Sequence, residues 1–343
     1  MSKGNYNKSS STDVYLNRII EGIFQIRIPL INVNVADLGH VNCYLIKGVS
    51  GWVLLDCGWY DVNTFKILKK SLKNINLELS DITHIVLTHS HPDHYGVASK
   101  IKQLFPKTQI FYHALEFCLI QSKRTELSNF KDISNLLSLH GVPEKNLNSM
   151  DFASIPTVKN DKKPDHIFYG GEIIHTGVFD LEVIWTPGHS PGHICMYEQK
   201  NKLLFSGDHI LPTITPNVSY MPFSGDNPLG NYLCSLIKLS NIPIRLVLPG
   251  HEYPFSELKD RIIAIIHHHC ERESEIQNII KNNYFNSYEI AQQLTWNVNL
   301  AWDEFPPLLK RAAITETIAH LEHMRWKGKI KRIFNENHFV YHL

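Results

Sequence analysis

The segment LTHSHPDHYG, residues 87–96, concentrates side chains that bind metal ions. Four of them fall within six positions, directly after an apolar run that reads as a buried strand: His89, His91, Asp93 and His94. Imidazole and carboxylate groups are common ligands of divalent metals. Such a density of polar groups at the end of a buried strand predicts a bound cation.

Three more groups of this type follow apolar runs, each in a turn that contains glycine. They are His189 in TPGHSPGH, Asp208 in FSGDH and His251 in LPGHE. Because loops at strand ends converge in α/β domains, we expect them to meet the first cluster. Seven ligands are too many for one tetrahedral zinc ion, and they suit two metals that share a carboxylate.

The seven side chains divide into two sites joined by one residue. We expect His89, His91 and His189 to form a three-nitrogen site and Asp93, His94 and His251 to form a second, more oxygen-rich one. Asp208 bridges them, because a carboxylate offers two oxygens. Zn²⁺ is the expected metal, and the same ligands also accept iron or manganese.

Strands and helices alternate around these ligands, which predicts an α/β domain in layers. The apolar runs predict early strands at 22–28, 41–48 and 51–58, and later ones at 83–88 and 109–113. Helical spacing predicts helices at 62–75 and 95–105. A β meander follows over 171–177, 179–186, 193–199 and 202–208. Residues 114–168 interrupt this alternation, and we interpret them as a helical insertion or lid.

From residue 258 onward the pattern is mainly helical. A long helix covers 257–283, a shorter one begins with Ser287 as its N-cap, and a third spans 307–328. Residues 329–343 predict a two-stranded hairpin. This order is typical of a winged-helix domain. The predicted organisation is a disordered tail over 1–18, a metal-binding domain over 19–257 and a winged-helix-like domain over 258–343.

The seven-ligand pattern resembles the metallo-β-lactamase superfamily, in its glyoxalase II-like dinuclear form. The likeness covers roughly residues 20–255 and implies an αββα sandwich with the metals at one edge between the sheets. By the same resemblance, Asp56 in LLDCG orients a ligand imidazole from outside the metal shell. The C-terminal segment is similar to one carried by some members, including mitochondrial lactamase-like endoribonucleases.

Composition limits the range of partners. A formal net charge of +1 gives no global reason to expect nucleic acid or an anionic membrane. The six cysteines are scattered, which predicts reduced, mostly buried thiols.

The N-terminal residues lack the apolar core of a signal peptide, so we expect a cytoplasmic protein with no membrane segment. The apolar helices of the C-terminal segment offer a surface for a homodimer or a cover for the insertion.

Metal-bound hydroxide predicts a hydrolase, with Asp93 as the catalytic residue that steers the nucleophile while acting as a ligand. Two substrate classes remain open. One is a small-molecule thioester, ester or lactone, and the alternative is single-stranded RNA. RNA usually demands clustered Lys and Arg, and the chain offers only Lys327, Lys329, Lys331 and Arg332 in the predicted hairpin region.

Other residues near the motifs have weaker signals. Asn217 and Tyr220 lie in the loop after Asp208 and are candidate substrate contacts. His193 and His209 are interpreted as packing or surface residues. The run HHHC at 267–270 is interpreted as structural, because consecutive helical residues point in different directions.

Overall fold

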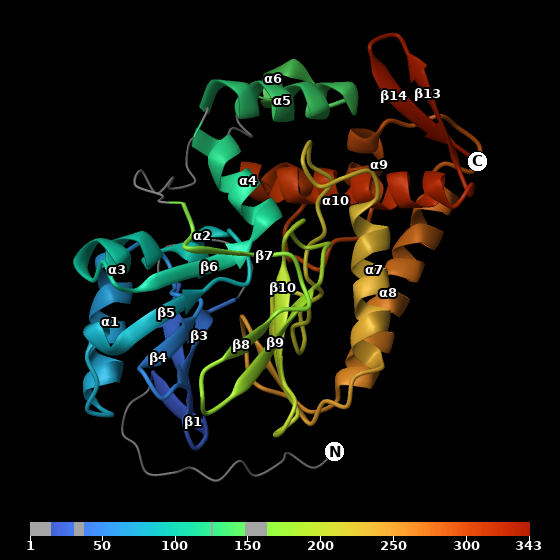
Figure 1. Cartoon of the computed structure of the whole chain (residues 1–343). Helices are drawn as coiled ribbons and strands as arrows, with labels where there is room; N and C mark the ends of the chain where they lie inside the picture. The colour runs from blue at the N-terminus through green and yellow to red at the C-terminus, as the bar shows by residue number, and fades with distance from the viewer. Residues whose placement is uncertain (1–14, 31–37, 125, 148–162) are drawn as a thin grey trace.

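Two β-sheets and flanking helices form four layers (Figure 1). The computed structural model describes residues 15–30, 38–124, 126–147 and 163–343. The first sheet has seven strands in the order of the chain: β1 (Leu16–Ile20), β2 (Ile23–Pro29), β3 (His40–Lys47), β4 (Trp52–Leu55), β5 (Ile82–Val86), β6 (Gln109–His113) and β7 (His166–Phe168). Strands β1 to β4 pair antiparallel, and β4 to β7 pair parallel.

The second sheet has the strand order β12-β11-β10-β9-β8. Its strands are β8 (Ile173–His175), β9 (Asp180–Trp185), β10 (Ile194–Glu198), β11 (Leu203–Gly207) and β12 (Leu246–Pro249). Strands β8 to β11 form the predicted antiparallel meander, and β12 joins β11 in parallel.

Alternating side chains divide the interior into three apolar layers. In β3, Cys43 and Leu45 pack toward α1 (Val62–Lys73) and α3 (Ala98–Leu104), whereas Tyr44 and Ile46 pack between the sheets. A strand buried on both faces reads as a continuous apolar run, as VNCYLI does. A third layer separates the second sheet from α7 (Pro228–Ser240) and α8 (Leu258–Ile279). The predicted αββα sandwich is confirmed.

Several predicted elements differ in their limits. The tail predicted over 1–18 overlaps a strand, because β1 begins at Leu16, and residues 1–14 lie outside the described residues. The helix expected over 95–105 begins later, as α3 (Ala98–Leu104), and Tyr95 instead ends the short helix α2 (Pro92–Tyr95). Gly96 lies between the two helices. Only glycine fits there, because a Cβ would lie 1.8 Å from the Gly58 carbonyl oxygen.

The predicted insertion contains α4 (Ala114–Arg124), α5 (Glu126–Leu139) and α6 (Glu144–Leu147), and it ends in strand β7. Residues 148–162 of this segment lie outside the described residues. Apolar side chains of α5 pack against Ile314 and Ile318, so the C-terminal helices cover the insertion. In Figure 1 these helices lie together beyond one edge of the sheets.

The C-terminal segment contains α8, α9 (Ser287–Gln293), α10 (Pro307–Trp326) and the hairpin β13 (Lys331–Asn335) and β14 (His338–His342). This is the predicted order of elements, and its identity as a winged helix stays a prediction. The N-cap of α9 is Asn286 rather than Ser287, because Asn286 Oδ1 accepts from the Glu289 amide in a capping box. Ser287 instead bonds the His140 ring.

All six cysteines are free, as predicted, but only Cys43, Cys57 and Cys195 are buried. Within the described residues, no helix combines the length and apolar character needed to cross a bilayer.

Candidate metal centre

Strand ends from both sheets position the candidate ligands. The loop after β5 and helix α2 carry the cluster from His89 to His94, and His189 lies in the connection between β9 and β10. Asp208 follows β11, and His251 lies two residues beyond β12. The carboxyl ends of the parallel pairs β4–β5 and β11–β12 therefore meet at one edge of the sandwich. A bridge between Val41 and His251 joins the sheets there.

One group of donors contains three imidazoles. His91 Nδ1 lies 2.9 Å from His89 Nε2 and 3.0 Å from His189 Nε2. The His89 ring is fully buried, and those of His91 and His189 are partly exposed. This is the predicted three-nitrogen set, brought together from two distant loops.

The second group joins Asp93 to two further imidazoles. His251 Nε2 lies 3.3 Å from Asp93 Oδ2 and 3.4 Å from His94 Nε2. Asp208 lies between the groups, since its Oδ1 is 3.3 Å from His94 Nε2 and its Oδ2 is 3.7 Å from His189 Nε2. The structure thus brings all seven predicted side chains together at one edge of the sandwich, and the bridging role of Asp208 stays a prediction.

The spacing of these atoms fits metal coordination. Donor atoms of the seven residues form two sets, each with all members within 4.8 Å of one another. Two nitrogens on a tetrahedral zinc ion would be separated by about 3.3 Å. Asp208 Oδ1 is buried, and besides the His94 imidazole 3.3 Å away it has no hydrogen-bond partner among the described residues. A Cβ at Gly250 would lie 2.3 Å from that oxygen, so the backbone passes close against the donors.

Outer partners orient the imidazoles. His94 Nδ1 donates to Asp56 Oδ2 at 2.8 Å, the contact that the resemblance implied. His251 Nδ1 donates to the His40 carbonyl at 2.9 Å, and His189 Nδ1 donates to the Asn217 carbonyl at 2.8 Å. A proton fixed on Nδ1 leaves Nε2 free to bind a metal.

Asp56 also supports the first group. Its two oxygens accept from the Thr88 amide and hydroxyl, both at 2.8 Å. The Thr88 hydroxyl in turn lies 3.0 Å from His89 Nδ1, so that ring donates to it. Asp56 is 2% exposed and has a left-handed φ of 56°, which Asp tolerates better than most residues.

A sequence model of the Metallo-beta-lactamase superfamily matches residues 36–251, which include all seven donors. The chain belongs to this superfamily. Among similar sequences, the Probable metallo-hydrolase YqjP of Bacillus subtilis is 26% identical over 316 residues, covering 88% of this chain and 92% of that protein. The Beta-lactamase-like protein 2 homolog of Caenorhabditis elegans is 24% identical over 301 residues, covering 85% of each chain.

Solved structures extend the likeness beyond the superfamily domain. The metallo-beta-lactamase family protein TTHA1429 from Thermus thermophilus has a TM-score of 0.79 at 26% identity, covering 95% of this chain and 99% of that one. A beta-lactamase domain protein from Burkholderia ambifaria has the same TM-score at 21% identity, covering 98% and 96%. Coverage this high includes the C-terminal helices, so they are part of the shared architecture.

In this superfamily member, burial and neighbouring charges shift the pKa values of three of the candidate ligand imidazoles. Burial, with the neighbouring His94, lowers the pKa of His89 well below its ordinary value. Burial also opposes protonation of His94 and His251, but nearby carboxylates, Asp208 foremost, outweigh it. They raise the pKa of His94 and bring that of His251 to about 10. Metal binding at the second group must therefore displace protons.

The predicted substrate contacts lie beside the donors in the loop after β11. The Asn217 carboxamide donates to Glu316 Oε2 at 2.6 Å and accepts from the Ser219 hydroxyl. Tyr220 is half-buried, and its amide donates to the Thr315 carbonyl. Both residues thus join the loop to α10, and their contact with substrate stays a prediction.

Several supporting residues were missed or only partly interpreted from the sequence. His193 was expected to pack or lie at the surface, and it is buried with its Nε2 accepting from the Asp208 amide at 3.1 Å. His209 is buried against the Tyr232 ring, as a packing residue. Glu252 accepts from the Thr213 amide and hydroxyl, which ties the loop after β11 to His251. In the sequence, the only indication of a role for Glu252 is that it directly follows the candidate ligand His251.

The histidine run at 267–270 diverges, as predicted for a helix. His267 is exposed beside Glu271, whereas His269 is buried with its Nδ1 3.0 Å from His320 Nε2.

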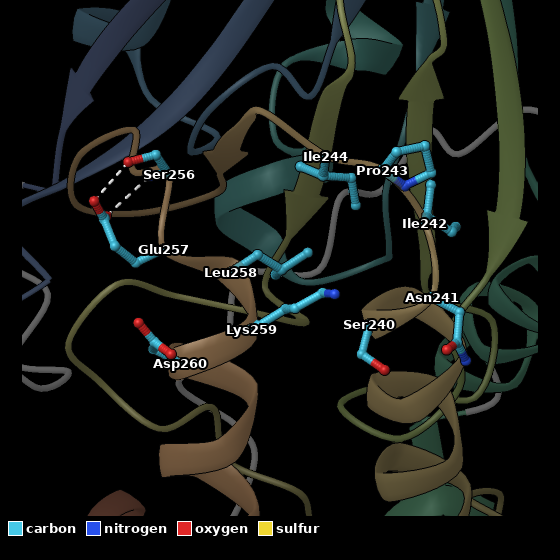
Figure 2. Close-up of a pocket in the computed structure, with 10 residues that line it drawn as sticks. All are labelled: Ser240, Asn241, Ile242, Pro243, Ile244, Ser256, Glu257, Leu258, Lys259 and Asp260. Atoms are coloured by element: carbon cyan, nitrogen blue, oxygen red, sulfur yellow. Dashed lines mark hydrogen bonds between the residues drawn. The ribbon is translucent and has the colours of Figure 1, made fainter.

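The cavity shown in Figure 2 lies away from the donors. It has a volume of about 590 Å³ and separates the end of α7 from the start of α8. Its wall includes Ile242 and Ile244, which precede β12, so it lies at the opposite end of that strand from His251. Glu257 at its rim accepts from the Ser256 amide and hydroxyl. This cavity is not the metal centre.

Proposed function

We propose that this chain is a dinuclear metal-dependent hydrolase, with Zn²⁺ as the expected metal. The observation that carries the proposal is the convergence of seven donor atoms in two sets, with Asp208 between them. Divalent ions bound there would lower the pKa of water from about 15.7 to about 7 and so supply hydroxide at neutral pH. The name of the Bacillus subtilis relative, a probable metallo-hydrolase, supports the same reaction class.

Asp93 is the proposed catalytic residue. Burial would raise the pKa of its carboxyl, but His94 and His251 outweigh that effect and hold it at about 2, so the group is ionised at neutral pH. Its Oδ2 faces His251, and the side chain is partly exposed. An ionised, partly exposed carboxylate at this position would orient the nucleophile by accepting a hydrogen bond from it.

Small acyl substrates fit the surroundings better than RNA. Glu316 is half-buried and bonds Asn217, whose carbonyl holds the ligand His189. An acidic side chain bonded to the residue that holds His189 supplies no positive charge for a phosphate backbone. We therefore propose a thioester, ester or lactone as the substrate.

Three of the four residues of the basic cluster in the C-terminal segment form ion pairs with acidic side chains. Lys327 and Lys329 both pair with Glu273, at 3.6 Å in the first case, and Arg332 pairs with Glu322 at 2.8 Å. RNA binding requires Lys and Arg that are available to phosphates. These ion pairs argue against the endoribonuclease alternative. A homodimer and a cytoplasmic location stay predictions.

A hydrolysis screen tests the proposal. Metal-loaded protein is incubated with thioesters, lactones and labelled single-stranded RNA, with and without chelator. We expect chelator-sensitive hydrolysis of one acyl class. The His251→Ala variant removes a candidate ligand, so its rate should fall by more than about 100-fold. That is more than the loss expected from removing a residue that only orients a ligand.

The matched control is His175→Ala, because His175 is an exposed histidine on β8 that pairs with Asp180. It should retain full activity. RNA cleavage alone, suppressed steeply by salt, would establish the alternative substrate. Hydrolysis of none of these substrates by protein that holds its metal would overturn the proposal.

A further inference from the structure

Glu116 on α4 joins the two loops that carry the three-imidazole group. Its side chain is fully buried, and its carboxylate accepts three hydrogen bonds. Glu116 Oε2 accepts from the Ser90 amide at 2.8 Å. Glu116 Oε1 accepts from the Ser190 hydroxyl at 2.7 Å and from the Gly192 amide at 2.8 Å.

These contacts flank the ligands of one group only. Ser90 separates His89 from His91, and Ser190 directly follows His189. The Gly192 segment lies close against α4, because a Cβ at Gly192 would be 2.8 Å from the Glu116 amide nitrogen. One buried carboxylate therefore sets the distance between the loop after β5 and the loop before β10.

The second group depends on other partners. His251 donates to the His40 carbonyl, and His94 donates to Asp56. Helix α4 contributes none of these contacts. A carboxylate that accepts from backbone amides forms hydrogen bonds about twice as strong as neutral ones, so Glu116 is well suited to hold loops in place.

We propose that Glu116 is a positioning residue that controls metal binding at the group of His89, His91 and His189, and not at the group of Asp93, His94 and His251. This inference rests on the proposed function only in that the first group holds a metal ion. It assigns no contact between Glu116 and substrate.

The Glu116→Gln variant tests the inference at nearly constant size. A Gln amide has one acceptor oxygen, so in either orientation its NH₂ faces an N–H or O–H donor. The matched control is Glu198→Gln. Glu198 is also buried and accepts from the Lys200 and Asn201 amides, but it caps the turn between β10 and β11 at the other end of the sheet.

The measurement is metal content and chelator-competition affinity with Zn²⁺, together with the absorption spectrum of the Co²⁺-loaded protein. We expect Glu116→Gln to bind one ion about 10- to 100-fold more weakly and the other as wild type does. Glu198→Gln should bind both ions as wild type does. Equal retention of both ions, or equal loss of both, in Glu116→Gln would overturn the inference.

Ser190→Ala keeps the test decisive if Glu116→Gln does not fold. It removes one of the three bonds and should weaken the same ion by about 2- to 10-fold. An unchanged affinity in Ser190→Ala would count against the inference. A wild-type protein that binds two ions and hydrolyses no substrate would contradict the proposed function alone. An active wild type with an unaffected Glu116→Gln would contradict this inference alone.

Discussion

Asp56→Asn should disturb the candidate metal centre with little change in the shape of the side chain. Asp56 accepts three hydrogen bonds of 2.8 Å, from His94 Nδ1 and from the amide and hydroxyl of Thr88. Asn has the same size and also tolerates the left-handed φ of 56° at this position. The backbone is therefore not strained, and only the capacity to accept hydrogen bonds is reduced.

The loss can be estimated from these contacts. With the amide nitrogen at the Oδ2 position, His94 Nδ1 loses its acceptor, and its proton shifts toward Nε2, where the metal binds. With the nitrogen at the Oδ1 position, the buried Thr88 amide loses its acceptor. Loss of an outer partner weakens metal binding by about 10- to 100-fold, which is about 1.4–2.8 kcal/mol. A buried unsatisfied donor also lowers the free energy of unfolding by about 1–3 kcal/mol.

Metal affinity by chelator competition and urea unfolding of the metal-free protein measure the two effects. Because His89 also depends on Asp56 through Thr88, both ions should bind more weakly, unlike in Glu116→Gln. Asp180→Asn is the control, since Asp180 accepts from His175 Nδ1 in the same way at an exposed site. Wild-type affinity for both ions in Asp56→Asn, or an equal loss of metal affinity in the control, would refute this role of Asp56.

Three more outcomes are expected. Gly250→Ala should lose metal and activity while it still folds, because its Cβ would clash with Asp208 Oδ1, and metal analysis with circular dichroism checks this. Loading metal at pH 8 should release protons into weak buffer, detected with an indicator dye, because the pKa of His251 is about 10 without metal. Burial lowers the pKa of His140 from 6.5 to about 3, so the unfolded chain protonates first and stability falls as pH drops from 6.5 toward 3. Between pH 7 and pH 5, metal-free wild type should lose about 2 kcal/mol more unfolding free energy than His140→Gln.

The seven donors were predictable because each one carries a local signal. Four lie in a single short motif, and the other three occur in glycine-containing turns at strand ends. Asp56 was predicted only by resemblance, since Asp is common in turns of every kind, where it bonds the nearby backbone. The N-cap of α9 was misplaced by one residue, although Glu289 lies three positions after Asn286 and favours a capping box there.

Glu116 could not be predicted, for a physical reason. Two of its three donors are backbone amides, which every residue except proline provides, so no residue type marks them. The split between α2 and α3 escaped prediction similarly, because Gly96 is needed only for its approach to the distant Gly58 carbonyl. Contacts that use the backbone across long sequence separations leave little pattern in the sequence.

The C-terminal helix α10 is connected to the candidate metal centre through the loop after β11. The Asn217 carbonyl fixes the proton of His189, and the Asn217 carboxamide bonds Glu316 of α10. The Tyr220 amide donates to the Thr315 carbonyl on the same helix. The orientation of one ligand is therefore coupled to α10 through a single residue. This coupling gives the C-terminal segment a role in shaping the centre that does not require it to bind nucleic acid.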